Sequence, residues 1–351
     1  MKIIISFIAF LMPLVILQGQ NESKLVIDAS PDQTNNNPLI RLRNNQGIDL
    51  MWIHSDYVTN TFAGTNTGVK NIPDNGGISN TFIGSEVAPN NTSGGNNTGV
   101  GYAAMNHNIT GSYNTAIGSL ALLSTTGSQY NTAIGYAAGR LHDNGYNNVF
   151  IGANTDVDAS GLYNVIAMGQ GTVVTASSTA RFGNSATGSY GGWADWSNVS
   201  DGRFKKNVTA NVVGLAFIMK LNPVTYNLDV SGLSAALNEN QGREWDQQMK
   251  QAIADKEKVV QSGFIAQDVE KVAKEVGYNF SGVDAPKNDH DFYGLRYAEF
   301  VVPLVKAVQE LNEKMLLQNI QIEAENKQLA DRLQNLENMV GMGKEVYSGN
   351  N

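Results

Sequence analysis

A series of glycines spaced 17 residues apart constrains the fold of this 351-residue chain more than any other feature. Short units that begin with asparagine and end with glycine recur through the middle of the sequence, and their glycines stand at positions 84, 101, 118, 135, 152 and 169. The last unit, Asn164 to Gly169, is one residue longer than the others, and a weaker unit, Asn60 to Gly64, lies 20 residues before the first. A fixed period of this length is typical of a solenoid, in which each repeat forms one coil.

The residue types within each unit favour extended backbone at its centre and turns at its ends. Thr, Val, Ile and Phe occupy the inner positions, and only alternate positions are consistently apolar, as in a half-buried strand. Gly and Asn at the ends supply left-handed turns. One unit is too short to bury its apolar face, but coils stacked about 4.8 Å apart bury it together. We therefore predict a mainly β solenoid of parallel 17-residue repeats over residues 58–187, with like residues, asparagines included, stacked in ladders.

Two other interpretations of the repeat are open at the level of sequence. A tract rich in Gly, Asn, Ser and Thr is compatible with disorder, although the regular Ile and Val positions argue against it. Its acidic residues would suit calcium loops, but Asp143, Asp156 and Asp158 are few and out of phase with the repeat. The chain has no cysteine and four scattered histidines, so we expect neither a metal nor a cofactor.

The N-terminus has the pattern of a secretory signal. A lysine at position 2 precedes an apolar run from Ile3 to Leu17, which is too short for a membrane span and lacks a stop-transfer cluster. We predict a cleaved signal peptide at residues 1–19, with a retained membrane anchor as the alternative, and no other transmembrane segment. The mature protein is then secreted or held at the cell surface. Residues 20–57 form either a β cap for attachment or the first turns of the solenoid.

The repeat resembles the head domain of trimeric autotransporter adhesins over about residues 55–185. Those heads contain Asn-x-x-Ile-Gly-type repeats that form a β-roll shared by three chains. The resemblance implies a homotrimer with a surface-binding role, whose glycan or protein ligand the sequence does not identify. Nucleic acid is not expected as a partner, because 24 Lys and Arg against 32 Asp and Glu give a net charge of −8, whereas an electrostatic nucleic-acid binder would carry a basic face.

The last third of the chain has a different composition, with more charge and less glycine after about Thr187. We expect helices over Leu215–Leu221, Trp245–Val260 and Ala266–Val276.

A long helix is expected from Glu299 onward. Its apolar residues alternate at spacings of three and four, which predicts a coiled coil at residues 301–342, followed by a short tail at residues 343–351. Docking of an amphipathic helix onto its own domain is the alternative. The predicted seam comprises Leu304, Val308, Leu311, Met315, Ile322, Leu329, Leu333, Leu336 and Val340.

Four motifs occur in a fixed order in this last third. They are VSDGRFKKNV at residues 199–208, LNPVTY at 221–226, GFIAQDVE at 263–270 and YAEFVVPLVKAVQEL at 297–311. In this order they closely resemble the self-cleaving intramolecular chaperone domain at the C-terminus of bacteriophage endosialidase tailspikes, other tail fibres and a membrane-bound transcription factor family. The resemblance covers about residues 199–320 and implies an α+β chaperone domain, which we place at residues 200–300 after a linker at residues 188–199.

The resemblance assigns roles to residues of the first motif. In that family the serine of Ser-Asp-x-Arg-x-Lys is the nucleophile and the lysine is its general base, and these positions are Ser200 and Lys205 here. The cleaved bond is then Val199–Ser200, and the chaperone leaves after three chains have assembled. Asp201 and Arg203 also match the motif and are expected to hold the turn rather than to react.

Ordinary residue chemistry is compatible with these roles. A serine hydroxyl is a weak nucleophile without an adjacent base, and a Ser–Lys pair supplies one. A lysine acts as a base only when neutral, and burial favours its neutral form, so burial on trimer formation would switch cleavage on. Lys206 is a rival base, and an unreactive surface serine and lysine are the alternative.

We therefore predict an exported, trimeric fibre or adhesin-like structural protein with an intramolecular chaperone domain, which acts once as an autoproteolytic serine peptidase. One alternative is an uncleaved surface-binding fibre with a permanent trimerisation stalk. Another is a tailspike-like glycan hydrolase, which needs paired carboxylates that the repeat does not place in phase. Four tyrosines recur near the repeat corners, for packing or for stacking on sugars: Tyr113, Tyr130, Tyr146 and Tyr163.

Overall fold

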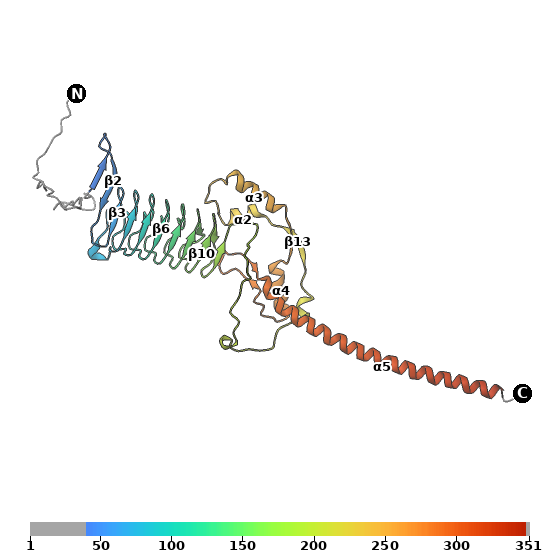
Figure 1. The fold of residues 1–351 in the computed structure, drawn as a ribbon. Helices are drawn as coiled ribbons and strands as arrows, with labels where there is room; N and C mark the ends of the chain where they lie inside the picture. Colours follow the sequence, from blue (N-terminus) through green and yellow to red (C-terminus); the bar gives the residue numbers. More distant parts are fainter. Residues whose placement is uncertain (1–39, 349–351) are drawn as a thin grey trace, which may run out of the picture.

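The computed structural model describes the backbone of residues 40–348 and the side chains of residues 40–339. A β-solenoid is followed by a mixed α/β region and by a long helix that projects away from both (Figure 1). This order confirms the β solenoid, the α+β region and the C-terminal helix predicted from the sequence. The predicted signal peptide at residues 1–19 lies outside the described residues.

One ten-stranded sheet runs along the solenoid. From its third strand onward neighbouring strands are parallel, and Thr98, Thr115 and Thr132 lie side by side in the register. A second, two-stranded parallel sheet joins β9 (Asp156–Val157) to β11 (Val173–Val174). The main sheet comprises, in order, β1 (Ile40–Arg43), β2 (Asp49–His54), β3 (Thr61–Ala63), β4 (Thr81–Ile83), β5 (Thr98–Val100), β6 (Thr115–Ile117), β7 (Thr132–Ile134), β8 (Val149–Ile151), β10 (Ile166–Met168) and β12 (Ala180–Phe182).

The first two strands form a hairpin at the N-terminal end of the sheet. β1 pairs antiparallel with β2, and β2 pairs antiparallel with β3, unlike the coils that follow. The ring of His54, at the end of β2, packs on the ring of Phe62 in the first coil, with 5.1 Å between their centroids. The described part of residues 20–57 is therefore a hairpin that covers the first parallel strand, and not a further coil.

Buried asparagines join each coil to the next. Oδ1 of Asn114 accepts a hydrogen bond from the backbone N–H of Asn131, one coil further along, at 3.0 Å, and its Nδ2 donates to the carbonyl oxygen of Ser128 at 2.7 Å. Both backbone groups lie at a turn and outside the strand ladder, so the side chain supplies the partner that a buried polar group requires. The same two bonds repeat at Asn80, Asn97, Asn131 and Asn148.

The interior of the solenoid is narrow and its corners are tight. The middle residue of each strand faces inward, and the rings of Phe62 and Phe82 stack there at 5.2 Å. At the corner after each strand the closing glycine has a positive φ, +137° at Gly118, and a Cβ added there would overlap the carbonyl oxygen of Gly135 in the next coil. Only glycine combines that backbone conformation with so close an approach of two coils.

The α/β region, which we define as residues 202–300, has its own small core. Phe217, Phe280 and Phe300 are buried in it with their rings in contact. Two short antiparallel pairs, β13 with β14 and β15 with β16, accompany the helices. The elements are η2 (Gly202–Phe204), α1 (Leu215–Ile218), β13 (Val224–Asn227), α2 (Val230–Ala236), α3 (Gln247–Glu257), β14 (Val260–Gly263), α4 (Ala266–Glu275), β15 (Val283–Asp284), β16 (Gly294–Leu295) and η3 (Tyr297–Phe300).

Two of the three helices predicted in this region agree with the structure within a few residues. They are α1 and α4. The helix predicted over Trp245–Val260 is wrong at its C-terminal end, because α3 stops at Glu257 and Val260 begins β14. The β-branched side chains of Val259 and Val260 favour extended backbone, and β13 provides the partner strand that the local pattern did not reveal.

The long helix α5 (Val301–Ser348) docks on the α/β region by its first turns and then projects alone (Figure 1). Ala307 is buried, and Oε2 of Glu310 accepts a hydrogen bond from the backbone N–H of Leu215 at 2.7 Å. Val340 lies beyond the described side chains. Among residues 40–348 no helix is long and apolar enough to cross a membrane. Apolar seam residues that are 47–59% exposed are Leu311, Met315, Ile322, Leu329, Leu333 and Leu336.

We expect Asn114→Ala to lower the free energy of unfolding by roughly 2–4 kcal/mol, because it leaves a buried N–H and a buried carbonyl without partners. The measurement is denaturant unfolding of the purified protein. Gln129→Ala, which removes an exposed amide from the same part of the solenoid, is the matched control and should change the stability little. Equal stabilities of the two variants would show that the buried asparagines are not needed to hold the coils.

Candidate functional site

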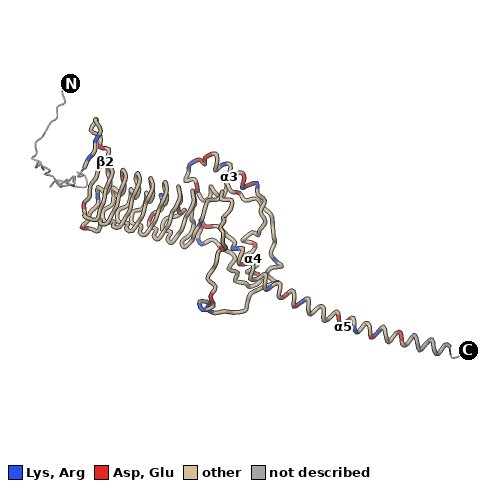
Figure 2. Tube along the Cα trace, viewed as in Figure 1, with Lys and Arg blue, Asp and Glu red and all other residues tan. Residues whose placement is uncertain are grey.

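The predicted cleavage motif lies on a segment that leaves the solenoid after β12 and loops away before it reaches α1, the first α-helix of the α/β region (Figure 1). Side chains along this segment are exposed, and those of Trp193, Trp196 and Val199 are almost fully so. Figure 2 shows acidic and basic residues gathered at the far end of the loop. The segment therefore presents large apolar side chains and a cluster of charges to its surroundings.

Ser200 and Lys205 are in contact on this segment. Nζ of Lys205 donates a hydrogen bond to Oγ of Ser200 at 2.8 Å, and both side chains are exposed. The short 3-10 turn η2 lies between them and returns the chain so that residues five positions apart face each other. The geometry joins the serine to Lys205, the first of two adjacent lysines.

Asp201 and Arg203 stabilise the turn between Ser200 and Lys205. Oδ1 of Asp201 accepts from the backbone N–H of Arg203 at 2.9 Å, which caps the turn, and Oδ2 accepts from Nη2 of Arg203 at 2.6 Å. The hydrogen-bonded Arg203 side chain lowers the pKa of the Asp201 carboxyl below its usual range, and Asp201 in turn raises the pKa of Arg203. Asp201 and Arg203 thus bond to each other on the turn, next to the contact between Ser200 and Lys205.

Chemically, this arrangement places a lysine amino group at hydrogen-bond distance from a serine hydroxyl. As an ammonium group, Lys205 donates to the serine oxygen over 2.8 Å. A neutral amine at the same place would accept the serine proton and leave an alkoxide beside the Val199–Ser200 peptide bond.

Residues 200–278 match the family model described as chaperone of endosialidase. The chain carries a chaperone of endosialidase domain. The matched range begins at Ser200. It contains the first motif except for Val199, and all of the second and third motifs, while the fourth, at residues 297–311, lies beyond the match. No curated protein and no solved structure gives a significant match.

The chaperone domain holds the start of the exposed segment through Ser185. Buried Glu239 accepts hydrogen bonds from the backbone N–H of Ser185 at 2.7 Å and from its Oγ at 2.6 Å. Nζ of Lys256 donates to the carbonyl oxygens of Ser185 and Thr187, at 2.6 and 2.7 Å. These partners were missed in the sequence, because no local pattern connects residues 54 to 71 positions apart.

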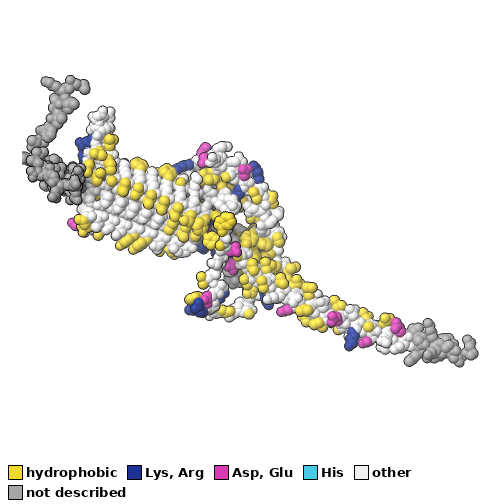
Figure 3. All heavy atoms as spheres, viewed as in Figure 1, with side chains coloured by type: hydrophobic (Ala, Val, Ile, Leu, Met, Phe, Trp, Pro, Cys, Tyr) yellow, Lys and Arg dark blue, Asp and Glu magenta, His cyan; other side chains and the backbone are white. Residues whose placement is uncertain are grey.

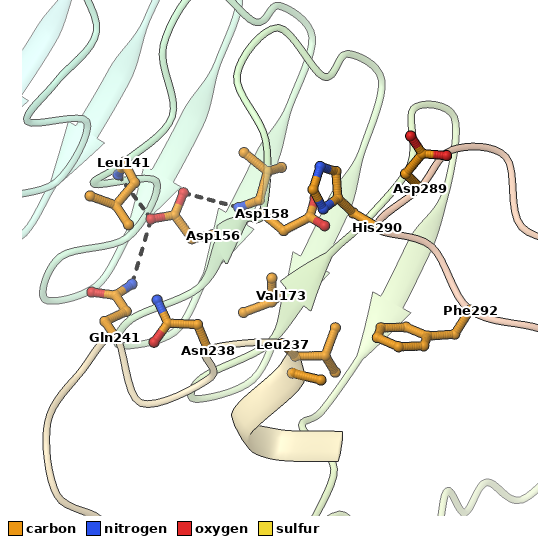
Figure 4. A pocket seen from close by; sticks show the side chains of 12 residues that line it. Leu141, Asp156, Asp158, Val173, Leu237, Asn238, Gln241, Asp289, His290 and Phe292 are labelled. Atoms are coloured by element: carbon orange, nitrogen blue, oxygen red, sulfur yellow. Dashed lines mark hydrogen bonds between the residues drawn. The ribbon is translucent and has the colours of Figure 1, made fainter. Parts of the chain in front are cut away.

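The last coils of the solenoid and the α/β region also meet around a cavity of about 340 Å³ (Figure 4). Asp156, on β9, is buried at its edge and accepts hydrogen bonds from the backbone N–H groups of Leu141, at 2.9 Å, and Val157, at 3.0 Å. Nε2 of Gln241 reaches the same carboxyl at 3.5 Å. Burial outweighs these donors and raises the pKa of Asp156 to about 7.

Other titratable groups face this cavity. Asp158, whose pKa burial also raises, lies opposite His290 of the α/β region. Among residues 40–339 no three His, Asp or Glu side chains are grouped so that they would hold a metal ion.

We expect the contribution of Asp156 to the free energy of unfolding to fall as pH rises from about 4 to about 7. The folded state then holds a proton at Asp156, whose pKa is about 7, that the unfolded state, with a pKa near 3.8, releases. Asp156→Asn should flatten this part of the profile, measured as denaturant midpoints between pH 4 and pH 8. Asp74→Asn, at an exposed carboxyl, is the control. Parallel profiles of wild type and Asp156→Asn would contradict the assignment.

Proposed function

We propose that this protein is an exported, trimeric fibre or adhesin-like structural protein whose C-terminal domain is an intramolecular chaperone that cleaves itself off at Val199–Ser200. A chaperone of endosialidase domain behind a β-solenoid fits a phage fibre-like protein. The observation that carries the proposal of cleavage is the 2.8 Å contact between Ser200 Oγ and Lys205 Nζ, at the first residue of the matched domain.

The proposed reaction uses groups that are already adjacent. The neutral amine of Lys205 takes the proton of the Ser200 hydroxyl, and Oγ attacks the carbonyl carbon of Val199. The C–N bond then breaks as the Ser200 nitrogen accepts a proton, which converts the peptide bond to an ester. Water hydrolyses the ester, leaving a carboxyl terminus at Val199 and an amino terminus at Ser200. Each chain is cut once.

Assembly of three chains would control this reaction. In the single chain the side chain of Lys205 is exposed. The side chains of Trp193 and Trp196, which precede Ser200 on the same segment, are almost fully exposed. Packing of neighbouring chains over these indoles would bury the segment and favour the neutral form of a lysine. Cleavage would then follow trimerisation and release the chaperone from a finished fibre.

Two exposed apolar surfaces support association of three copies. Residues at the ends of successive solenoid strands form a column in which Ile83, Ile117 and Ile134 are about 40% exposed, with Val100 and Ile151 in register between and beyond them. Figure 3 shows apolar side chains aligned in such rows along the solenoid. The second surface is the α5 seam. Contiguous apolar surfaces of this kind mark protein interfaces.

We expect the intact mass of the purified wild-type protein to correspond to a break between Val199 and Ser200. Ser200→Ala and Lys205→Ala should each abolish the break, because one removes the nucleophile and the other the base. Lys206→Ala is the matched control and should be cleaved like the wild type. Full-length mass for every protein would instead support the alternative, an uncleaved fibre with a permanent trimerisation stalk.

We expect a charge in the α5 seam to prevent both assembly and cleavage. Leu333→Glu places a carboxylate where three helices would meet, so sedimentation equilibrium should give a monomer, and the Val199–Ser200 bond should stay intact although Ser200 and Lys205 are unchanged. Asn335→Glu adds the same charge at an exposed position outside the seam. A trimer with Leu333→Glu, or cleavage of its monomer, would contradict the coupling.

A further inference from the structure

Four exposed tyrosines form two stacked pairs at one corner of the solenoid. The rings of Tyr113 and Tyr130 lie 4.8 Å apart at an interplanar angle of 7°, and those of Tyr146 and Tyr163 lie 5.1 Å apart at 3°. All four side chains are 41–53% exposed. Each pair joins adjacent coils, because its members are 17 residues apart.

The four tyrosines follow one another along the solenoid as a column, and this column is displaced between the two pairs. Tyr130 and Tyr146 are 16 residues apart, one fewer than the repeat, although the backbone register continues unchanged from β7 to β8. The residue in register with Tyr130 is Asn147, and both have a positive φ of 58°. Tyr146 instead lies beside Gln129 through an isolated parallel bridge. The column therefore shifts sideways by one residue at this coil.

A cavity of about 340 Å³ lies where the column shifts, within the range of small-molecule sites. Tyr130 and Tyr146 both line it, and each already uses one ring face on its stacked partner. The remaining lining consists of the amide side chains of Gln129, Asn144 and Asn147, with glycine and serine. No charged side chain lines the cavity.

We propose that this tyrosine cavity binds an uncharged saccharide. Pyranose rings present C–H faces that pack on aromatic rings, and their hydroxyls pair with amide groups, which both donate and accept hydrogen bonds. An acidic sugar would call for a lysine or arginine, and neither lines the cavity. The site belongs to the solenoid and does not depend on cleavage at Ser200.

The test is binding of the full chain to an array of neutral, sialylated and sulfated glycans, followed by titration of the strongest neutral ligand. Wild type and Ser200→Ala should both bind neutral glycans. Tyr130→Ala and Tyr146→Ala should each weaken binding about tenfold or more, because each removes an aromatic face. Tyr102→Ala, which removes an exposed solenoid tyrosine outside the cavity, should leave binding unchanged.

Thermal unfolding and sedimentation of each variant separate loss of the site from loss of the fold. Unchanged unfolding midpoints and oligomeric states, together with weaker binding by both cavity variants, would support the proposal. Binding to no neutral glycan on the array, preference for acidic glycans, or full affinity in both variants would overturn it. So would dissociation of the oligomer by either tyrosine substitution, which would place this corner in a subunit interface.

Discussion

The structure depends on hydrogen bonds that buried asparagines make across the coils. Each of these side chains accepts from a backbone N–H and donates to a backbone carbonyl of the next coil, as Asn114 does with Asn131 and Ser128. Because these bonds have to recur at every level, they require the same residue at the same offset, and the period stays at 17 residues through the centre of the solenoid. The closing glycines, such as Gly118, then allow the coils to approach closely enough for the bonds to form.

The same regularity creates a problem of register. Coils that resemble one another can pair one level too high or too low with little loss of energy, both within a chain and between chains. A long helix forms from local contacts and assembles fast, so it can align three chains before their solenoids pair. In the proposed trimer this would be the role of α5, which continues directly from the domain that holds the end of the solenoid through the contact of Glu239 with Ser185.

Features that repeat or follow a motif could be predicted from the sequence, whereas contacts between distant residues could not. The solenoid was predicted because each unit carries the same residue types at the same positions, and the chaperone domain because its motifs recur in order. By contrast, Glu239 and Ser185 are 54 residues apart, and each is ordinary in its own context. The strand at Val260 could not be predicted, because it pairs with β13, whose nearest paired residue, Asn227, lies 33 positions earlier in the sequence. Ser200 and Lys205 were singled out by their motif, and the turn capped by Asp201 is what brings them within 2.8 Å.

In the proposed assembly, residues 200–351 align three solenoids, and the solenoids do not reach this state without them. The direct measurement is to refold residues 20–351 and residues 20–199 side by side, and to determine mass by sedimentation equilibrium and survival under protease. We predict a soluble, protease-resistant trimer from the longer chain and misaligned, protease-sensitive aggregates from the shorter one. A soluble, resistant trimer from residues 20–199 alone would contradict the account.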